Sequence, residues 1–175
     1  MTGVNHWHAV RVKPNCERVA AISLSAKGIE HCLPVRRQEK RWSDRYKVVE
    51  KPLFPGYVFC RFDLGQRVAV LTTPGVVHVV CYGGSPAPID PAEIEAVRTL
   101  ETSGLDVEPW PYVESGQRVW IERGPIAGVE GVVLDSKSGR RLVVSVTMLR
   151  RSVAVEVDAE WVRPLPREMK GSPYA

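Results

Sequence analysis

Residues 52–59 read Pro-Leu-Phe-Pro-Gly-Tyr-Val-Phe, a break in the chain followed at once by strand-forming residues. Proline lacks a backbone donor and glycine adopts turn conformations at low cost, so a strand cannot run through the start of this segment. Residues 57–62 are rich in aromatic and β-branched side chains, which favours a strand. Phe54 lies between two prolines that hold its backbone rigid. This predicts a ring presented at a binding surface, and the alternative is a ring that fills the core.

The residues upstream predict a strand followed by an amphipathic helix. Residues 7–12 alternate, with Trp7, Ala9 and Arg11 on one face, as in a strand. Asn15 is a candidate N-cap and Gly28 a candidate C-cap for the helix that follows. The apolar residues that recur at helical spacing are Val19, Ile22 and Ala26, with Ala20 and Leu24 beside them.

A basic hairpin is predicted between this helix and the 52–59 segment. A second strand is expected to start near Glu30 and to run past Val35, and Trp42-Ser-Asp-Arg is expected to form the turn of the hairpin. Residues 36–51 contain seven Lys or Arg against three Asp or Glu, an excess of 7 − 3 = 4. Such a segment is either a solvated hairpin or a loop that faces phosphates.

The residues that follow complete an α+β pattern. Residues 66–72 are compatible with a short helix, the apolar run 76–82 predicts a buried central strand, and Gly83-Gly84 predicts a turn. Asp90-Pro91-Ala-Glu93 starts a helix with an N-cap, a proline at the first helical position and a glutamate in the first turn. Its apolar stripe is Ile94, Val97 and Leu100, and it ends at Gly104. This order predicts helices flanking a mainly antiparallel sheet.

The second part of the chain has a different hydrophobic pattern. Residues 105–115 contain Pro109 and Pro111 without periodicity and are interpreted as a linker. Short β-rich runs then follow at close spacing, which predicts a small β-barrel over residues 116–164. The last residues, 165–175, are expected to form a flexible tail.

Composition excludes several classes of protein. Apolar residues make up 44% and charged residues 25%, and the net charge of +4 is too modest to indicate a nucleic-acid binder by itself. There is no run of ~20 apolar residues to span a membrane and no signal-peptide pattern, so we expect a cytoplasmic protein. Cys16, Cys32, Cys60 and Cys81 lack the spacing of zinc modules and are expected to be buried thiols. No nucleophile–base pair or phosphate-binding loop predicts an enzyme or a cofactor.

Three segments resemble the NusG family of transcription elongation factors. They are His6-Trp7-His-Ala-Val10 with Lys13-Pro14, residues 52–59 with Pro74-Gly75-Val76, and the glycine-spaced residues 116–133 with 151–158. The resemblance implies an N-terminal NGN domain (1–104) with an α/β sandwich, the linker 105–115, and a C-terminal KOW domain (116–164) with an SH3-like barrel. It further implies a monomer that binds RNA polymerase and modulates pausing or termination.

The resemblance also implies three sets of contact residues. An apolar depression that receives the β′ clamp helices of the polymerase would contain Trp7, Leu53, Phe54 and Tyr57, although Trp7 could equally fill the domain core. Replacing Phe54 and Tyr57 by alanine should then leave the fold intact. Contacts to the non-template DNA strand would come from Arg11, Lys13, Arg18 and Lys27, each of which could also be a plain surface charge. The charge of the hairpin, rather than the resemblance, makes Arg36, Arg37, Lys40 and Arg41 further candidates for nucleic-acid contacts. A KOW partner, Rho or a small-subunit ribosomal protein, would contact Met148, Leu149 and Arg150, although Leu149 could equally belong to the barrel core.

Several features resemble the specialised RfaH and UpxY groups of the family, which act as antiterminators at selected operons. However, Ser23, Ala26 and Lys27 replace the DNA-reading residues of RfaH, and Gln66-Arg67-Val68 replaces the element that touches the polymerase β subunit. Because residues 143–146 and 153–157 favour strands, we predict a barrel, not the helical hairpin of RfaH, at rest. The alternatives are a general NusG factor that recruits Rho or ribosomes, and a KOW-type RNA- or ribosome-binding protein.

Overall fold

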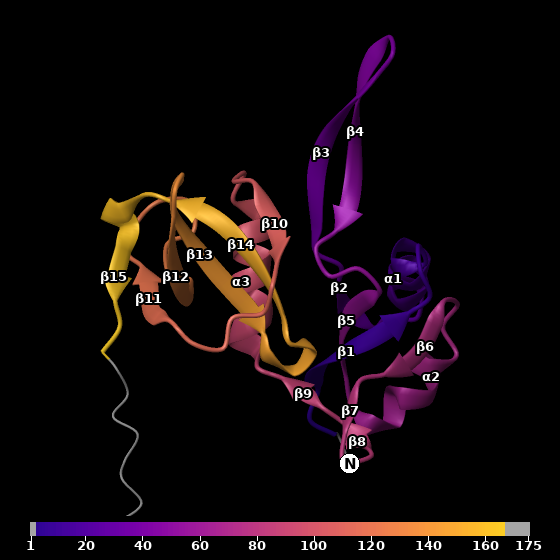
Figure 1. Ribbon diagram of the computed structural model, residues 1–175. Helices are drawn as coiled ribbons and strands as arrows, with labels where there is room; N and C mark the ends of the chain where they lie inside the picture. The colour runs from indigo at the N-terminus through magenta and orange to yellow at the C-terminus, as the bar shows by residue number, and fades with distance from the viewer. Residues whose placement is uncertain (1–2, 167–175) are drawn as a thin grey trace, which may run out of the picture.

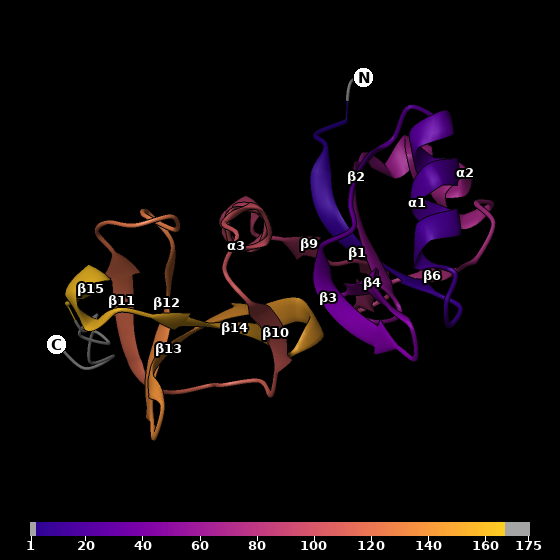
Figure 2. The same ribbon diagram turned by 90° about the horizontal axis from the view of Figure 1, so that it is seen from above.

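The computed structural model describes residues 3–166, and they form two large antiparallel sheets with a helix between them, together with two separate two-stranded hairpins (Figures 1 and 2). The N-terminal sheet has the strand order β2-β5-β1-β6, and β9 pairs with β1. Its strands are β1 (His6–Val12), β2 (Glu30–Cys32), β5 (Tyr57–Phe62), β6 (Val76–Val79) and β9 (Pro88–Ile89). No helix within residues 3–166 is both long and apolar enough to cross a membrane.

Strand β1 is the centre of the N-terminal sheet and is buried on both faces. It pairs antiparallel with β5 on one side and with β6 and β9 on the other. Trp7 and Ala9 pack into one apolar cluster, whereas Val10 and Val12 pack into a second cluster behind the sheet. The alternation predicted for this strand is therefore confirmed, with both faces covered.

The buried central strand predicted for residues 76–82 was wrong. Strand β6 lies at one end of the strand order, and Val77 is 53% exposed. The run is then cut, because β7 (Cys81–Tyr82) pairs with β8 (Ser85–Pro86) in a separate hairpin. Gly83 and Gly84 both have positive φ, which a two-residue hairpin turn of this kind needs, and this confirms the predicted turn.

Helix α1 (Glu17–Ala26) exists as predicted but buries a different face. The buried residues are Glu17, Ala20, Ala21 and Leu24, whereas Val19 and Ile22 are 50% and 65% exposed. The Glu17 carboxylate accepts a hydrogen bond from the Gly56 amide at 2.9 Å, which holds the start of the helix against the segment before β5. Asn15 is not the N-cap, because it has φ 61° and the helix begins after Cys16. Gly28 ends the helix with φ 70°, as predicted.

The hairpin β3 (Val35–Trp42) and β4 (Arg45–Pro52) forms a sheet of its own and projects away from the rest of the molecule (Figure 1). Trp42 pairs with Arg45 across a turn of two residues, which confirms the predicted hairpin. The strand expected to run from Glu30 past Val35 is not continuous, because the strand conformation is interrupted at Leu33-Pro34.

A short 3₁₀ turn and two helices follow β5. The turn η1 (Leu64–Gln66) leads into α2 (Arg67–Leu71), as the sequence predicts. Helix α3 (Pro91–Thr102) starts with the predicted cap, because Asp90 Oδ1 accepts a hydrogen bond from the Ala92 amide at 2.9 Å. Its predicted stripe is fully buried and faces β13 (Gly139–Val146) of the second sheet.

The C-terminal sheet has the order β10-β14-β13-β12-β11-β15, and its strands confirm the β-rich prediction for this part of the chain. The further strands are β10 (Val107–Trp110), β11 (Gln117–Ile121), β12 (Glu130–Ser136), β14 (Arg151–Val157) and β15 (Val162–Pro164). The prediction of an irregular linker was wrong for β10, which pairs with β14 over four residues. Residues 167–175 of the expected tail lie outside the described residues.

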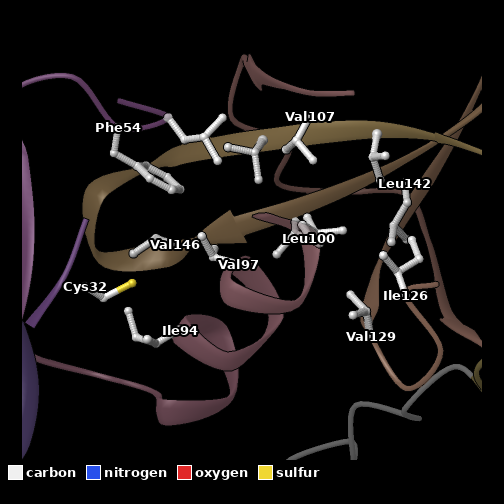
Figure 3. Packing of buried hydrophobic residues seen from close by; sticks show 14 of the residues in the cluster. Cys32, Phe54, Ile94, Val97, Leu100, Val107, Ile126, Val129, Leu142 and Val146 are labelled. Atoms are coloured by element: carbon white, nitrogen blue, oxygen red, sulfur yellow. The ribbon is translucent and has the colours of Figure 1, made fainter. Parts of the chain in front are cut away.

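One apolar cluster joins α3 to both sheets (Figure 3). It contains Trp7 and Phe54 from the N-terminal side, Val97 and Leu100 from α3, and Val146 among many residues of the C-terminal sheet. The second cluster lies between the N-terminal sheet and α1 and is separate from the first. The two sheets are therefore joined by continuous apolar packing, with α3 as the middle layer.

Candidate functional site

The segment that contains Leu53 and Phe54 is a rigid turn, but its side chains are covered. The Leu53 amide donates to the Pro34 carbonyl oxygen at 2.9 Å, and the Tyr57 amide donates to the Phe54 carbonyl oxygen at 3.1 Å. Both Leu53 and Phe54 are 1% exposed, and the Phe54 ring packs edge-on against Phe59 at 5.3 Å between centroids. The predicted exposure of Phe54 was wrong, because α3 and the C-terminal sheet join the cluster around it.

Trp7 is covered by α3. Its side chain is buried on β1, and the guanidinium carbon of Arg98 lies 4.9 Å from its ring centroid. Because Arg98 belongs to α3, its guanidinium covers the Trp7 ring from the side of the helix. Trp7 is therefore a core residue, and the helix that covers it, α3, lies outside the N-terminal sheet.

Tyr57 remains partly exposed and links the two sheets. The guanidinium carbon of Arg11, on β1, lies 5.0 Å from the Tyr57 ring centroid, and that of Arg151, on β14, lies at 5.3 Å. Such contacts contribute roughly 0.5–1 kcal/mol each at exposed sites. Arg98 and Arg151 were not among the residues predicted from the sequence, because their partners are far away along the chain.

Two polar contacts hold α3 in its middle position. The Glu101 carboxylate accepts a hydrogen bond from the Val35 amide at 2.9 Å, which ties the end of the helix to β3. The Thr147 hydroxyl donates to the Glu93 carboxylate at 2.6 Å, which ties its start to the C-terminal sheet. The four predicted polymerase-contact residues therefore lie together on the N-terminal side. Trp7, Leu53 and Phe54 are covered by α3 and the C-terminal sheet, whereas Tyr57 is partly exposed.

The basic residues near the first strand and helix do not form one free cluster. Lys27 Nζ donates to the Ala69 carbonyl oxygen at 2.7 Å and to Thr73 Oγ1 at 3.1 Å, so it anchors α2. Arg18 donates to Glu50 at 2.5 Å, and this contact holds the pKa of Glu50 below its usual value. Lys13 is exposed, and Arg11 packs on Tyr57.

The predicted hairpin residues divide into a paired base and an open tip. At the base, Arg36 contacts Asp106 at 3.4 Å and Arg37 contacts Glu50 at 3.2 Å. Toward the tip, Lys40 and Arg41 are exposed and have no ion-pair partner among the described residues. Unpaired positive charge on the hairpin is therefore concentrated toward the tip.

Met148, Leu149 and Arg150 lie at the turn between β13 and β14. Met148 and Leu149 belong to the 3₁₀ turn η2 (Thr147–Leu149); Met148 is 37% exposed, whereas Leu149 is half-buried against the cluster that joins the sheets. Arg150 has φ 48° and forms an ion pair with Glu114. This side of the C-terminal sheet thus faces the N-terminal side.

The thiols fit the sequence prediction in part. Cys32 and Cys60 are buried, and burial raises the pKa of Cys60 to about 12. Cys81 is exposed and Cys16 is partly exposed, so these two are not buried as predicted. Within residues 3–166 no group of three or more His, Cys, Asp or Glu side chains could hold a metal ion.

Comparisons with known proteins agree on one family. A family model described as transcription termination factor nusG matches residues 5–98. The transcription termination/antitermination protein NusG of Thermus thermophilus is 33% identical over 175 residues, which cover 87% of this chain and 94% of the relative. The protein of the same name from Escherichia coli O6:H1 is 31% identical and covers 74% of this chain and 71% of its own length.

A solved structure shares the fold. The structure that describes domain interaction in Thermotoga maritima NusG is similar with a TM-score of 0.53 at 22% identity, and the match covers 93% of this chain and 98% of that one. At this identity the similarity concerns the fold alone. With the family model and the relatives, the chain belongs to the NusG family of transcription factors.

Proposed function

We propose that this chain is an elongation factor that binds the β′ clamp helices of RNA polymerase through Trp7, Leu53, Phe54 and Tyr57. The observation that carries the proposal is that these side chains come together on one side of the N-terminal sheet, although they are up to 50 positions apart along the chain. Aromatic residues on a rigid segment suit such a role, because they bury a large area at low entropic cost.

The proposal requires that the covered surface open. In the described state the surface is closed by α3 and the C-terminal sheet, so a clamp helix would have to replace them. The polar contacts between the cover and the N-terminal side are few: Glu101 with the Val35 amide, Asp106 with Arg36, and the guanidinium groups of Arg98 and Arg151 over Trp7 and Tyr57. Most of the closure is apolar packing. Apolar packing is not directional, so another apolar surface of matching shape is able to replace it.

We further propose that Arg11, Lys13 and Arg18, with the hairpin, face the non-template DNA strand, and that the factor acts as a specialised antiterminator. Phosphate contacts of this kind read little sequence and weaken with salt. Lys27 is a weaker candidate than the sequence suggested, since its ammonium is already engaged by α2. Whether the turn with Met148 and Leu149 binds Rho or a ribosomal protein depends on the same opening, because Leu149 faces the covered side.

Transcription in vitro tests the proposal. Purified polymerase, with and without the full chain, is followed on templates that carry a Rho-dependent and an intrinsic terminator. An antiterminator is expected to increase readthrough at both, whereas a general factor that recruits Rho would increase termination at the first. If the protein alters neither pausing nor termination but sediments with ribosomal subunits, the translational alternative replaces the proposal.

Replacing Tyr57 by alanine is expected to weaken polymerase binding by about 10-fold or more, the scale of an interface hot spot. The ring is partly exposed, so the change should cost roughly 1–2 kcal/mol of stability, the loss of its two cation–π contacts. Binding is measured by titrating labelled protein with polymerase.

Two control variants make the Tyr57 result interpretable. Tyr82→Ala removes an exposed tyrosine on β7 that does not belong to the apolar cluster, and it should leave binding unchanged. Arg151→Ala removes part of the cover but keeps the ring, so binding should tighten by roughly 2- to 5-fold. Equal affinities for wild type and Tyr57→Ala would remove the aromatic docking surface from the proposal.

A further inference from the structure

The pairing register of β3 and β4 sorts the hairpin side chains onto two faces. Residues directly opposite each other in an antiparallel pair share a face, and the faces alternate along each strand. One face, called here the basic face, consists of the pairs Arg36–Lys51, Gln38–Val49, Lys40–Lys47 and Trp42–Arg45. The other, called the mixed face, consists of Val35–Pro52, Arg37–Glu50, Glu39–Val48 and Arg41–Tyr46.

Charge is divided unevenly between these faces. The basic face has five cationic side chains and no carboxylate, whereas the mixed face has two arginines and two glutamates. The overall excess of positive charge on the two strands therefore lies on one face. Among the five cations of the basic face, Arg36 at the base has an ion-pair contact, with the exposed Asp106.

The pair Lys40–Lys47 adds a second argument. Two like charges directly opposite each other destabilise a sheet, and both lysines are exposed on a hairpin that packs against little else. The mixed face avoids this arrangement, because Arg37 lies opposite Glu50 and contacts it at 3.2 Å. Like charges lie opposite each other on the basic face, whereas the mixed face pairs opposite charges. This difference indicates that the charges of the basic face serve to bind a partner.

The tip of the basic face has an exposed tryptophan. Trp42 is 58% exposed and lies opposite Arg45 at the end of the hairpin. Strands of eight residues hold this indole roughly 25 Å from the base of the hairpin, beyond the packed part of the molecule. Exposing an indole to water costs free energy. A row of cations that ends in an aromatic ring is suited to a nucleic-acid strand, because the cations contact its phosphates and the ring stacks on an unpaired base.

We propose that the basic face of the β3–β4 hairpin binds single-stranded DNA, with the lysines on the phosphates and Trp42 stacked on a base. The inference rests on the DNA contact in the proposed function but assigns it to one face, and it adds Trp42, Arg45, Lys47 and Lys51 to the residues predicted from sequence. Single-stranded DNA is favoured over duplex because base faces are covered inside a duplex. The face has no set of hydroxyls or carboxylates that would read a ribose 2′-hydroxyl.

Binding of the full chain to free DNA, without polymerase, tests this inference separately from the polymerase proposal. The probe is a fluorescein-labelled oligothymidine of about 16 nucleotides, the upper site size of single-strand-binding folds. Anisotropy is measured between about 50 and 200 mM salt, and a duplex and an oligouridine of the same length serve as competitors. Since every substituted side chain is exposed or at the hairpin surface, circular dichroism should stay the same, and the melting temperature should change only slightly.

Two double variants with equal loss of charge on opposite faces provide the comparison. Lys40→Gln with Lys47→Gln, on the basic face, is expected to weaken binding by about 10-fold or more at the lowest salt and to reduce the salt slope by about 1.4, or 0.7 per phosphate contact. Arg37→Gln with Arg41→Gln, on the mixed face, should change the affinity by less than about 2-fold. Trp42→Ala should weaken binding by about 5-fold or more, and Trp42→Phe should restore most of the affinity.

Several results would overturn the inference. Equal losses for the two double variants would mean that general charge, not the basic face, holds the DNA. Competition by the duplex as strong as that by the single strand would remove the stacking role of Trp42, and stronger competition by the oligouridine would reassign the face to RNA. Absence of binding by the wild type at the lowest salt would remove the site, while the polymerase proposal would stand.

Discussion

Replacing Phe54 by alanine is expected to lower the free energy of unfolding of the full chain by about 3–5 kcal/mol. The ring is 1% exposed, packs against Phe59, and belongs to the cluster that joins α3 to both sheets. Its removal would leave a cavity that rigid neighbours on three elements cannot fill. Chemical denaturation followed by circular dichroism measures the change, provided that the slope with denaturant stays the same.

Tyr46→Ala is the matched control for this substitution. Tyr46 is an aromatic residue on the hairpin and is 70% exposed, so its loss should change stability by less than about 0.5 kcal/mol. The sequence alone predicted an exposed Phe54 whose replacement leaves the fold intact. A loss of less than about 1 kcal/mol would support that earlier view, because it would mean that the ring is solvated for most of the time in solution.

Acidification from pH 6.5 to pH 4 is expected to destabilise the protein by roughly 3 kcal/mol through His8 alone. The His8 side chain is 4% exposed, its ring lies 4.5 Å from Phe62, and Nδ1 has no hydrogen-bond partner among the described residues. Burial, and to a lesser degree the neighbouring His6, lowers the pKa of His8 to about 4.

The direction of this pH effect follows from which state of the protein, folded or unfolded, binds the proton on His8 more tightly. Between pH 4 and the unfolded pKa of about 6.5, the unfolded chain takes up a proton that the folded chain rejects. The contribution of His8 to stability is therefore complete above about pH 6.5, and it is lost at up to about 1.4 kcal/mol per pH unit as the pH falls toward 4. Below the folded pKa both states are protonated, and the loss levels off.

Denaturation curves of wild type and His8→Met across this pH range measure the effect. Methionine keeps an apolar side chain in the site and cannot titrate, so the difference between the two proteins isolates His8 from the carboxylates. His6→Gln removes an exposed imidazole from the same strand and should keep most of the pH dependence. Parallel curves for wild type and His8→Met would show that His8 is hydrated in solution.

Local chemistry made part of the fold predictable. The start of α3 depends on Asp90 and Pro91, the end of α1 on Gly28, and the turn of the basic hairpin on the residues after Trp42. In each case the signal and the structure lie within a few residues of each other, so no tertiary information is needed.

Distant contacts decided what was mispredicted. The buried face of α1 includes Glu17, whose carboxylate accepts a hydrogen bond from the Gly56 amide 39 positions away, and it leaves Val19 and Ile22 exposed. Strand β10 forms because β14 offers an edge, although prolines argued for an irregular segment. The cover over Phe54 likewise comes from residues beyond Asp90. The sequence therefore grouped residues that do lie in one cluster, but it did not predict that the cluster is covered.

The position of β10 limits how the C-terminal sheet can swing away. One residue, Asp90, connects β9 to α3, and residues 103–106 connect α3 to β10. If β10 unzips from β14, residues 103–116 become a flexible tether of about 14 residues between α3 and the sheet, with a root-mean-square span of roughly 20 Å. Helix α3, joined to β9 by one residue, must in addition move off Trp7 for the surface to open fully. A tether of this length keeps the released sheet at an effective concentration in the millimolar range. The polymerase would then compete with the C-terminal sheet for the same surface. Its apparent Kd would equal the intrinsic Kd divided by the fraction of molecules that are open.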